Sequence, residues 1–534
     1  MAFFSFTRVV TTLSIVVGVY GHTDEVADPP PETDPTTYFT LGAHKLAMRT
    51  HIILMVLSWI IILPIATMLS LARSRYTCFV RLAFTAANTI GILFGVAYKS
   101  RTPDLYPGSA HSAVGWIATG ITAAQVSHLL VGPITKLFRF ARRNETKTGR
   151  YILSPMRESF QSLRSHPLGL SRHGSIDVEA THVLIDSDTS HSRSSGFTSG
   201  GDTYLGESDS IPVLQRDPSP VFSKMLSAPF LSRTRRLISL IHNVMDSTIL
   251  LMGFVALCTG VVTFWGLFQG QTVFNGVAHW IKGGVFFWLG IFNLGRWCGC
   301  FVEKGWAWNT RPGTSVWLSA ELVESSLIFF YGSTNIFLEH LAGWGKAWTR
   351  RDLEHLAITV LFIGGGLCGI LVEYIRVRGF DEKRTSQLRA GWSTEHTQHK
   401  SSGLSMNPLP ALVIFLMARS MASHEQDSMV STMVHNQWGN LLGAGSVARL
   451  LTYMIMHLKP PTSMAPSRPP TELLSSFCLI SGGLLFMASS QDTVDGMIHH
   501  DIDPMALYTV TMGFTGILMA WIIGLLAIKD RASR

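Results

Sequence analysis

Residues 51–75 read HIILMVLSWIIILPIATMLSLARSR and decide the fold. The stretch between His51 and Arg73 is predominantly apolar and as long as the roughly 20 residues that a membrane-spanning helix requires. The histidine at its start needs an explanation, because an imidazole gains nothing from contact with lipid. It indicates a helix cap, a polar interface between helices, or a ligand to a metal or a haem.

The composition of the whole chain agrees with this stretch. Of 534 residues, 47% are hydrophobic and only 15% are charged, whereas about 25% of the residues of a soluble protein are charged. The composition therefore predicts a protein that resides in a lipid bilayer. The net charge of +8 fits Lys- and Arg-rich cytoplasmic loops, so we exclude nucleic acid as the partner.

Apolar segments of spanning length recur along the chain. We predict an all-α fold, a polytopic transmembrane helix bundle, because helices satisfy their own backbone hydrogen bonds in lipid. The eleven predicted spans are residues 50–72, 78–98, 110–132, 244–267, 274–296, 313–336, 354–375, 406–421, 433–457, 471–490 and 505–528.

The segments between the spans suggest the domain organisation. Residues 1–21 have the short apolar run of a signal peptide, and residues 22–43 form an acidic, Pro-rich leader that we expect to be lumenal and disordered. Residues 44–133 form a three-helix membrane region, 134–236 a cytosolic, disordered Ser/Arg-rich linker, and 237–534 a C-terminal membrane domain.

The distribution of basic residues predicts the orientation. Eleven spans that follow a lumenal or extracellular N-terminus place the C-terminus in the cytosol. The predicted cytosolic loops carry most of the basic loop residues, as the positive-inside rule requires, although Lys99 and Lys346 depart from the rule. We expect a multi-pass protein of the secretory pathway, the vacuolar membrane or the plasma membrane.

Two of the predicted spans begin alike. His51 lies 22 residues before Arg73, and His111 lies 22 residues before Pro133. In two helices that run in the same direction, these imidazoles lie at similar depth, where they could hold a haem iron between them. His44 lies two helical turns before His51 and is a rival ligand. The alternative is a pair of interfacial histidines that bond to neighbouring helices.

The same helices resemble the cytochrome b561 family. The segment HIILMVLSWIIILP resembles the first core helix of that family, and HSAVGWIATGITAAQ resembles the third. The resemblance implies one b-type haem near the lumenal face, held by His51 and His111, with a small molecule or a protein as electron donor. The second haem site of that family is broken, because RLAFTAANTIGILFGVAY contains no histidine and the fourth helix offers only His242.

Most of the chain resembles the fungal Ytp family, which is named for yeast putative transmembrane protein. The segments that carry the likeness are FNGVAHWIKGGVFFWLGIFNLGRWCGCFVEKGWAWN, STNIFLEHLAGWGKAWTRRDLEHLAITVLFIGGGLCGIL and HEQDSMVSTMVHNQWGNLL. The resemblance implies a b561-like N-terminal region joined to a multi-span C-terminal domain. It implies no reaction, because the activity of that family is not established.

Several histidines of the C-terminal half fall on the predicted lumenal side. Imidazoles and carboxylates gathered at one depth suit a divalent metal ion, although a motif as tight as His-Glu-x-x-His is absent from the sequence. Helix caps and hydrogen bonds between helices are the alternative. The candidate metal ligands are His279, His340, His355, His424 and His435.

Charged residues also lie inside predicted spans. Glu321 and Glu324 share one helix face, and Arg449 lies within a later span. Charges in the bilayer are costly and therefore face partners or a polar cavity. A proton or cation path through the two glutamates is one interpretation. A buried ion pair with Arg449 or Arg419 that holds the bundle together is the other.

Two functions from different classes follow. The first is an electron-transfer or transmembrane redox protein that binds one b-type haem through His51 and His111. The second is a protein that handles a divalent metal at the lumenal histidines or transports protons or cations through Glu321 and Glu324. The sequence does not decide whether the protein is an enzyme.

Overall fold

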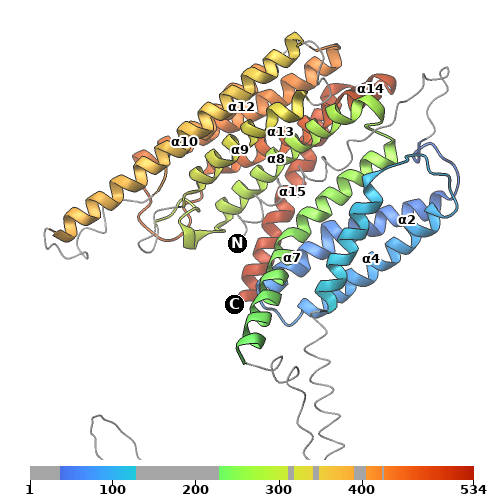
Figure 1. Ribbon diagram of the computed structural model, residues 1–534, viewed down its shortest axis with the longest axis horizontal. Helices are drawn as coiled ribbons and strands as arrows, with labels where there is room; N and C mark the ends of the chain where they lie inside the picture. The colour runs from blue at the N-terminus through green and yellow to red at the C-terminus, as the bar shows by residue number, and fades with distance from the viewer. Residues whose placement is uncertain (1–36, 128–227, 311–317, 341–347, 390–403, 424–425) are drawn as a thin grey trace, which may run out of the picture. The chain divides into compact units, whose positions relative to one another are not determined.

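Helices make up all the regular structure of the residues that the structure describes (Figure 1). The computed structural model describes residues 37–127, 228–310, 318–340, 348–389, 404–423 and 426–534. The main helices are α2 (Lys45–Val56), α3 (Leu63–Leu71), α4 (Thr77–Lys99), a helix over residues 110–127, α7 (Ala228–Trp265), α8 (Val273–Cys298), α9 (Ala320–His340), α10 (Arg350–Arg389), α11 (Leu409–Ala422), α12 (Met429–Leu458), α13 (Pro470–Ala488), α14 (Gln491–His499) and α15 (Pro504–Ser533). The predicted all-α fold class is confirmed.

Eight helices among the described residues are long and apolar enough to cross a membrane. They are Lys45–Leu71, Thr77–Lys99, Thr248–Trp265, Val273–Cys298, Asp352–Gly379, Met429–Leu458, Pro470–Ala488 and Pro504–Ser533, and each coincides with a predicted span. The three remaining predicted spans are also helical, as the 110–127 helix, α9 and α11. Helix α11 is apolar but short, and the described residues of the other two are less apolar than those of the eight helices above. The architecture is that of a polytopic helical membrane protein.

The chain divides into two compact units. The first comprises residues 1–127 and 242–534, and the second comprises residues 128–241. The predicted signal peptide, most of the leader and nearly all of the 134–236 linker lie outside the described residues. All the sites described below belong to the first unit.

Pro64 explains an irregularity in the first span. Proline has no N–H and its ring clashes with the carbonyl group four residues earlier. The chain widens into a π-helical stretch at Leu57–Ile62 immediately before Pro64. The carbonyl oxygen of Ile60, which Pro64 cannot reach with a hydrogen bond, accepts one of 3.2 Å from the indole N–H of Trp521 on α15. A partner helix thus satisfies the exposed backbone group, as lipid cannot.

Two glycines allow α2 and α4 to approach closely. A Cβ atom on Gly91 would lie 2.7 Å from the Cε atom of Met55, and one on Gly95 would lie 2.8 Å from Nδ1 of His51. The Gly-x-x-x-Gly spacing puts both glycines on one face of α4, which is the usual arrangement for close packing of membrane helices. The contact therefore places His51 directly against the backbone of α4.

A buried polar contact ties the N-terminal helices to α7. The Arg81 guanidinium on α4 lies 3.0 Å from the Asp246 carboxylate on α7. The Gln125 amide on the 110–127 helix donates a 2.8 Å hydrogen bond to the same carboxylate. Three helices therefore meet at Asp246, which compensates the cost of a charge at that depth.

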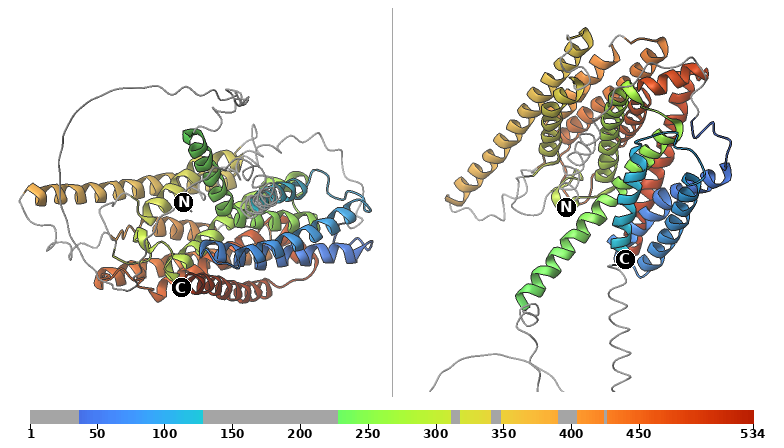
Figure 2. Two further views of the ribbon diagram at one scale, coloured as in Figure 1. Left: turned by 90° about the horizontal axis from the view of Figure 1, so that it is seen from below. Right: turned by 45° about the vertical axis from the view of Figure 1, so that its right-hand side comes forward.

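Glycines also allow close contacts between the C-terminal helices. Figure 2 shows these helices from two sides. Helix α8 packs mainly on α13, and α9 packs mainly on α10. A Cβ atom on Gly283 would lie 2.5 Å from the carbonyl oxygen of Gly483, and one on Gly366 would lie 2.5 Å from the backbone nitrogen of Phe329. Gly366 belongs to the FIGGGLCGIL segment of α10, so a glycine there allows α9 and α10 to pack closely.

Helix α14 differs from the prediction, which placed a loop at residues 491–504. Asp492 near the start of α14 accepts a 3.0 Å hydrogen bond from the hydroxyl of Thr272. A carboxylate in the first turn of a helix is favourable next to the exposed N–H groups. This amphipathic helix of nine residues is too short and too polar to be recognised as a span.

Candidate functional site

The structure brings His51 and His111 together from separate helices. The centroids of the two imidazole rings lie 6.4 Å apart, and the ring planes are inclined by 78°. His51 lies on α2 and His111 on the 110–127 helix. We call these two residues the N-terminal histidine pair.

Hydrogen bonds fix the chemistry of each ring in this pair. Nδ1 of His51 donates to the carbonyl oxygen of Gly91, 2.8 Å away. Nδ1 of His111 lies 3.3 Å from the hydroxyl oxygen of Thr259, which uses its own proton on the carbonyl groups of Val255 and Ala256. Both rings therefore carry their proton on Nδ1 and the lone pair on Nε2. Metal-binding histidines usually show this arrangement, with one nitrogen anchored and the other bearing the lone pair.

A glycine lies beside each ring of the N-terminal histidine pair. Gly95 of α4 faces the His51 ring, and a Cβ atom on Gly260 of α7 would lie 3.1 Å from the His111 ring. His44, the rival ligand, caps α2 from an exposed position with a left-handed backbone (φ 50°). It precedes the helix, so the two-turn spacing that would align it with His51 does not apply. The side chain of His242 lies outside the described residues.

A second pair of histidines forms in the C-terminal domain, and we call it the C-terminal histidine pair. The ring centroids of His279 on α8 and His435 on α12 lie 6.0 Å apart, with the ring planes inclined by 85°. Nδ1 of His279 donates to the carbonyl oxygen of Asn275 at 2.8 Å, and Nδ1 of His435 donates to that of Ser431 at 2.9 Å. Nε2 is again the nitrogen that carries the lone pair.

The other candidate metal ligands are placed less closely. His355 of α10 interacts electrostatically with His279, but the described residues contain no group of three or more His, Cys, Asp or Glu side chains that could hold a metal ion. The side chain of His340 and all of His424 lie outside the described residues. Of the five candidate ligands, the structure thus brings the rings of His279 and His435 into contact.

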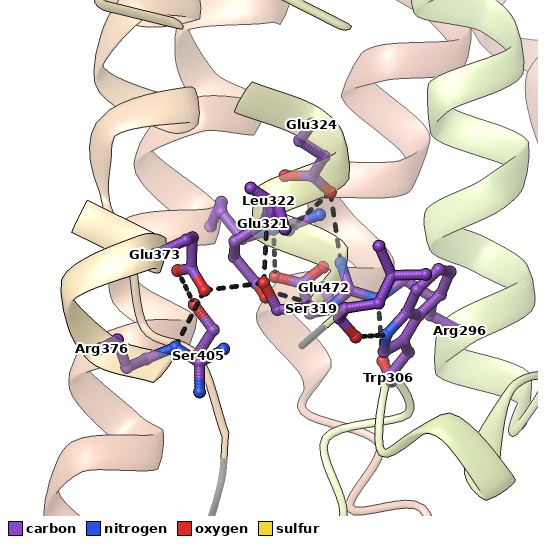
Figure 3. Close-up of polar contacts among 12 residues, drawn as sticks. Arg296, Trp306, Ser319, Glu321, Leu322, Glu324, Glu373, Arg376, Ser405 and Glu472 are labelled. Atoms are coloured by element: carbon purple, nitrogen blue, oxygen red, sulfur yellow. Dashed lines mark hydrogen bonds and ion pairs between the residues drawn. The ribbon is translucent and has the colours of Figure 1, made fainter. Parts of the chain in front are cut away.

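Glu321 and Glu324 belong to a buried network that we call the ion-pair cluster (Figure 3). Arg296 of α8 lies 3.2 Å from Glu321 and 3.3 Å from Glu324. Arg449 of α12 lies 3.4 Å from Glu324 and 2.7 Å from Glu472 of α13. These five side chains are at most 9% exposed, so the cluster links α8, α9, α12 and α13 deep in the domain.

One tryptophan and one further carboxylate border the cluster. Both guanidinium groups lie over the ring of Trp308, with the carbon atoms at their centres 4.7 Å (Arg296) and 5.4 Å (Arg449) from the ring centroid. Such contacts stabilise a desolvated cation. Glu373 lies beside the cluster, accepts hydrogen bonds from Ser319 and Ser405, and pairs with Arg376 at 2.8 Å.

Sequence reasoning missed several members of this network. It named Arg449 and Arg419 as candidate partners of the glutamates. Arg419 is exposed and bonds to Asn440 instead, while Arg296 was not considered. The signal for Arg296, Glu373 and Glu472 was present, because each is a charged residue inside a predicted span. Their pairing depends on helix contacts that the sequence does not state.

Comparisons with known proteins agree with the fold. The family model described as "Protein YTP1-like, C-terminal" matches residues 252–530, and a "Domain of unknown function (DUF2427)" matches residues 32–134. An uncharacterized membrane protein of Schizosaccharomyces pombe is 33% identical over 96% of this chain and 99% of its own length.

Two further relatives come from Saccharomyces cerevisiae. An uncharacterized membrane protein is 34% identical over 93% of this chain and 84% of its own length. Protein YTP1 is 24% identical over 57% of this chain and 58% of its own length. The chain therefore belongs to the YTP1-like family and, with eight apolar helices of spanning length among its described residues, is an integral membrane protein.

Proposed function

We propose that the N-terminal helices bind one b-type haem between His51 and His111, and that the protein transfers electrons in its membrane. The observation that carries the proposal is the 6.4 Å contact of two imidazoles whose Nδ1 atoms are both anchored. When bound, a b-type haem supplies one-electron transfer. The resemblance to the b561 family points in the same direction.

The residues present fit this group. Because metal–nitrogen bonds to histidine are about 2.0–2.1 Å long, two rings that would share one metal have centroids about 6 Å apart. The N-terminal histidine pair has this separation. Gly95 and Gly260 allow the two rings to lie directly against the backbones of α4 and α7, which fixes the position of each ring.

Each surrounding residue has a definite task in this proposal. His51 and His111 hold the iron. The carbonyl oxygen of Gly91 and the hydroxyl of Thr259 orient the two rings and keep the proton on Nδ1. An electron donor, either a small molecule or a protein, would complete the activity.

The test is a reduced-minus-oxidised absorption spectrum of the purified full-length protein. A b-type signal that disappears in His51→Ala and in His111→Ala, while both variants remain folded, supports the proposal. The matched control is His279→Ala, which removes a half-buried histidine of the C-terminal domain and should leave the signal intact. A folded protein that stays colourless after haem is supplied during expression rules the proposal out.

The C-terminal histidine pair supports a second candidate function, the handling of a divalent metal ion. The specific observation is the 6.0 Å separation of two rings whose Nδ1 atoms bond to backbone carbonyl groups. Metal analysis after equilibration with Zn²⁺ tests it. We expect binding that decreases in His279→Ala and His435→Ala but persists in His457→Ala. Equal metal content in all four proteins would exclude this site.

For Glu321 and Glu324 we propose a structural role. Both carboxylates lie in ion pairs with arginines, which favours a role in holding the bundle together over a proton or cation path. Flux measurements in proteoliposomes separate the two. A proton or cation flux that Glu321→Gln and Glu324→Gln abolish without unfolding the protein would establish transport and overturn the structural role.

We also propose the membrane orientation. The basic residues of the predicted loops place the N-terminus in the lumen or outside the cell and the C-terminus in the cytosol. Protease protection of epitope tags at the two ends of the mature chain tests this. Cleavage of the C-terminal tag on the lumenal side would reverse the proposed orientation.

A further inference from the structure

Two cysteines separated by one glycine lie at the end of α8, and neither proposed function uses them. Cys298 is the last residue of α8, Gly299 follows it, and Cys300 is the second residue after the helix. Both thiols are free and half-buried. We call Cys298 and Cys300 the thiol pair.

The backbone at Gly299 turns Cys300 back against α8. Gly299 has a left-handed conformation (φ 102°), which residues with a side chain rarely adopt. The N–H group of Cys300 donates a 2.9 Å hydrogen bond to the carbonyl oxygen of Gly295, and that of Gly299 donates one of 3.0 Å to Arg296. These two bonds form the Schellman motif that commonly ends a helix. The main chain therefore fixes the position of Cys300.

The turn brings both thiols to one face of the last turn of α8. Cys298 lies three residues after Gly295, so the two positions are neighbours on the helix surface. A Cβ atom on Gly295 would lie 3.8 Å from both Cβ and Sγ of Cys300, so the Cys300 side chain covers this glycine. The two thiols also interact electrostatically with each other. The helix end therefore presents two sulfur atoms on one face.

Charged side chains from two other segments act on the thiol pair. Arg468, from the segment before α13, interacts electrostatically with Cys298, and Lys529, near the end of α15, interacts with Cys300. Asp530 acts on both thiols with the opposite sign. Two cations and one anion of the described part of the chain therefore leave a local charge of +1. Positive surroundings of this kind stabilise thiolate sulfur.

The number and type of the ligands select the metal ion. The described residues contain no group of three or more His, Cys, Asp or Glu side chains that could hold a metal, so the pair does not fit an ion that needs three or four protein ligands, such as Zn²⁺. Thiolates are soft ligands that favour Cu(I), and Cu(I) readily accepts two thiolates in a near-linear arrangement. Two thiolates and one Cu(I) carry a net charge of −1, which the local charge of +1 balances.

We propose that the thiol pair binds one Cu(I) ion between the sulfur atoms of Cys298 and Cys300. Each thiol releases its proton when the ion binds. In the orientation proposed above, the site lies on the cytosolic side, because it adjoins the C-terminal end of α15. The cytosol keeps thiols reduced, which preserves both ligands.

The thiol pair and the C-terminal histidine pair lie at opposite ends of α8. The helix rises about 28 Å from His279 to Cys298, which is close to the thickness of the hydrocarbon core of a bilayer, about 30 Å. One helix thus carries sulfur ligands at one boundary of the membrane and an imidazole at the other. The Cu(I) assignment stands without the haem and without the metal ion proposed for the histidines, because it uses neither set of ligands.

The experiment measures Cu(I) binding to the reduced full-length protein in phosphatidylcholine nanodiscs under argon. Cu(I) is supplied as its acetonitrile complex, and the coloured chelator bicinchoninate competes for it. We expect one tightly bound Cu(I) per protein. Cys298→Ser and Cys300→Ser should each weaken binding by more than the roughly 10–100-fold that the loss of an outer-shell partner costs, because each removes a ligand.

Two variants serve as matched controls. Cys368→Ser removes an exposed cysteine of α10, and His279→Ala removes an imidazole at the other end of α8. Both proteins should bind Cu(I) like the wild type.

A second measurement needs no variant. Phenylarsine oxide bonds to two neighbouring thiols at once, with the release of one water molecule. One equivalent should protect both Cys298 and Cys300 of the wild type from alkylation by N-ethylmaleimide, as measured by mass spectrometry. Cys368 should remain open to alkylation.

Three results would overturn the assignment. Tight Cu(I) binding that persists in either Cys298→Ser or Cys300→Ser would show that the thiols do not act together. Binding that is lost in Cys368→Ser or in His279→Ala, with the variant shown to be folded by its unfolding temperature, would place the ion elsewhere. A wild-type protein that binds neither Cu(I) nor the arsenical would leave the two cysteines with packing as their only role.

Discussion

The two histidine pairs of this protein have nearly the same internal geometry but different surroundings. The ring centroids lie 6.4 Å apart in the N-terminal pair and 6.0 Å apart in the C-terminal pair. In the N-terminal pair, both anchors of Nδ1 come from other helices, Gly91 of α4 and Thr259 of α7. In the C-terminal pair, each ring is anchored four residues back in its own helix.

The neighbours of the rings differ as well. Glycines flank the N-terminal pair. The C-terminal pair lies against aromatic rings. The ring centroid of Phe486 lies 5.7 Å from that of His279, and the ring centroid of Trp438 lies 5.8 Å from that of His435. A pair whose Nδ1 anchors come from several helices suits a large group such as haem, which would contact those helices. A pair enclosed by aromatic rings suits a single ion. Surroundings, rather than the distance between the rings, distinguish the two proposed sites.

The largest expected effect comes from breaking the ion-pair cluster. Arg449→Ala leaves Glu472 and Glu324 short of a partner in a buried site, and removing one partner of a buried ion pair costs about 3–5 kcal/mol. Helices α8 and α12 carry both the cluster and the C-terminal histidine pair. We therefore expect Arg449→Ala to lower both the stability of the protein and its Zn²⁺ binding. The haem spectrum should remain unchanged. Thermal unfolding, metal content and absorbance measure the three quantities.

The matched control for this prediction is Arg419→Ala. Arg419 is exposed, and among the described residues it bonds to the Asn440 side chain at 3.4 Å, so its loss should change stability by less than about 0.5 kcal/mol. A protein with Arg449→Ala that melts like the wild type would show that the cluster does not support this domain.

The second prediction tests whether the glycines fix the positions of the histidine rings. Gly95→Ala places a methyl group where the His51 ring now lies, 2.8 Å from Nδ1. The ring must shift, and we expect haem occupancy to fall by about tenfold, as it does when a group that orients a ligand is lost. Gly115→Ala on the 110–127 helix is the control, because a Cβ atom there meets nothing within 4 Å. Equal haem occupancy in Gly95→Ala and Gly115→Ala would show that the contact between Gly95 and the His51 ring does not matter for haem binding.

The third effect tests the anchors themselves. Thr259→Val removes the hydroxyl that accepts from Nδ1 of His111 while keeping the size of the side chain. We expect haem to dissociate about tenfold faster, measured by transfer to apomyoglobin. In the C-terminal pair the nearer anchors of Nδ1 are backbone carbonyl groups, which a side-chain substitution does not remove. An unchanged rate would mean that packing alone orients His111.

The smallest effect concerns the proline bulge in the first span. Trp521→Phe removes the donor to the carbonyl oxygen of Ile60. A buried acceptor without its partner costs about 1–3 kcal/mol, and the Pro64 ring prevents the usual helical replacement. Thermal unfolding should therefore show a modest loss of stability. Trp265→Phe, at a 42% exposed position, should have no effect.

Much of the fold was predictable from the sequence. Lipid imposes helices of a known length, so eight of the predicted spans coincide with apolar helices in the structure. The equal spacing of His51 and His111 within their segments anticipated the contact of the two rings. Helix α14 escaped prediction because its pattern is that of a polar loop, and Arg296 escaped because its partners lie on α9.

The side chains around the sites were less predictable. Nothing in the sequence states that the carbonyl group of Gly91 faces His51 or that two arginines lie over the ring of Trp308, since both depend on how the helices are rotated about their axes. Sequence periodicity identifies which face of a helix is apolar, but not which neighbour covers it.

The central claim is that His51 and His111, and not the C-terminal pair, hold a haem. The most direct measurement is the haem content of purified wild type, His51→Ala, His111→Ala, His279→Ala and His435→Ala, normalised to protein. The account predicts about one haem per protein in the wild type and in the two C-terminal variants, and almost none in the two N-terminal variants. Haem that is lost in His279→Ala but kept in His51→Ala would contradict it, as would five folded proteins without haem.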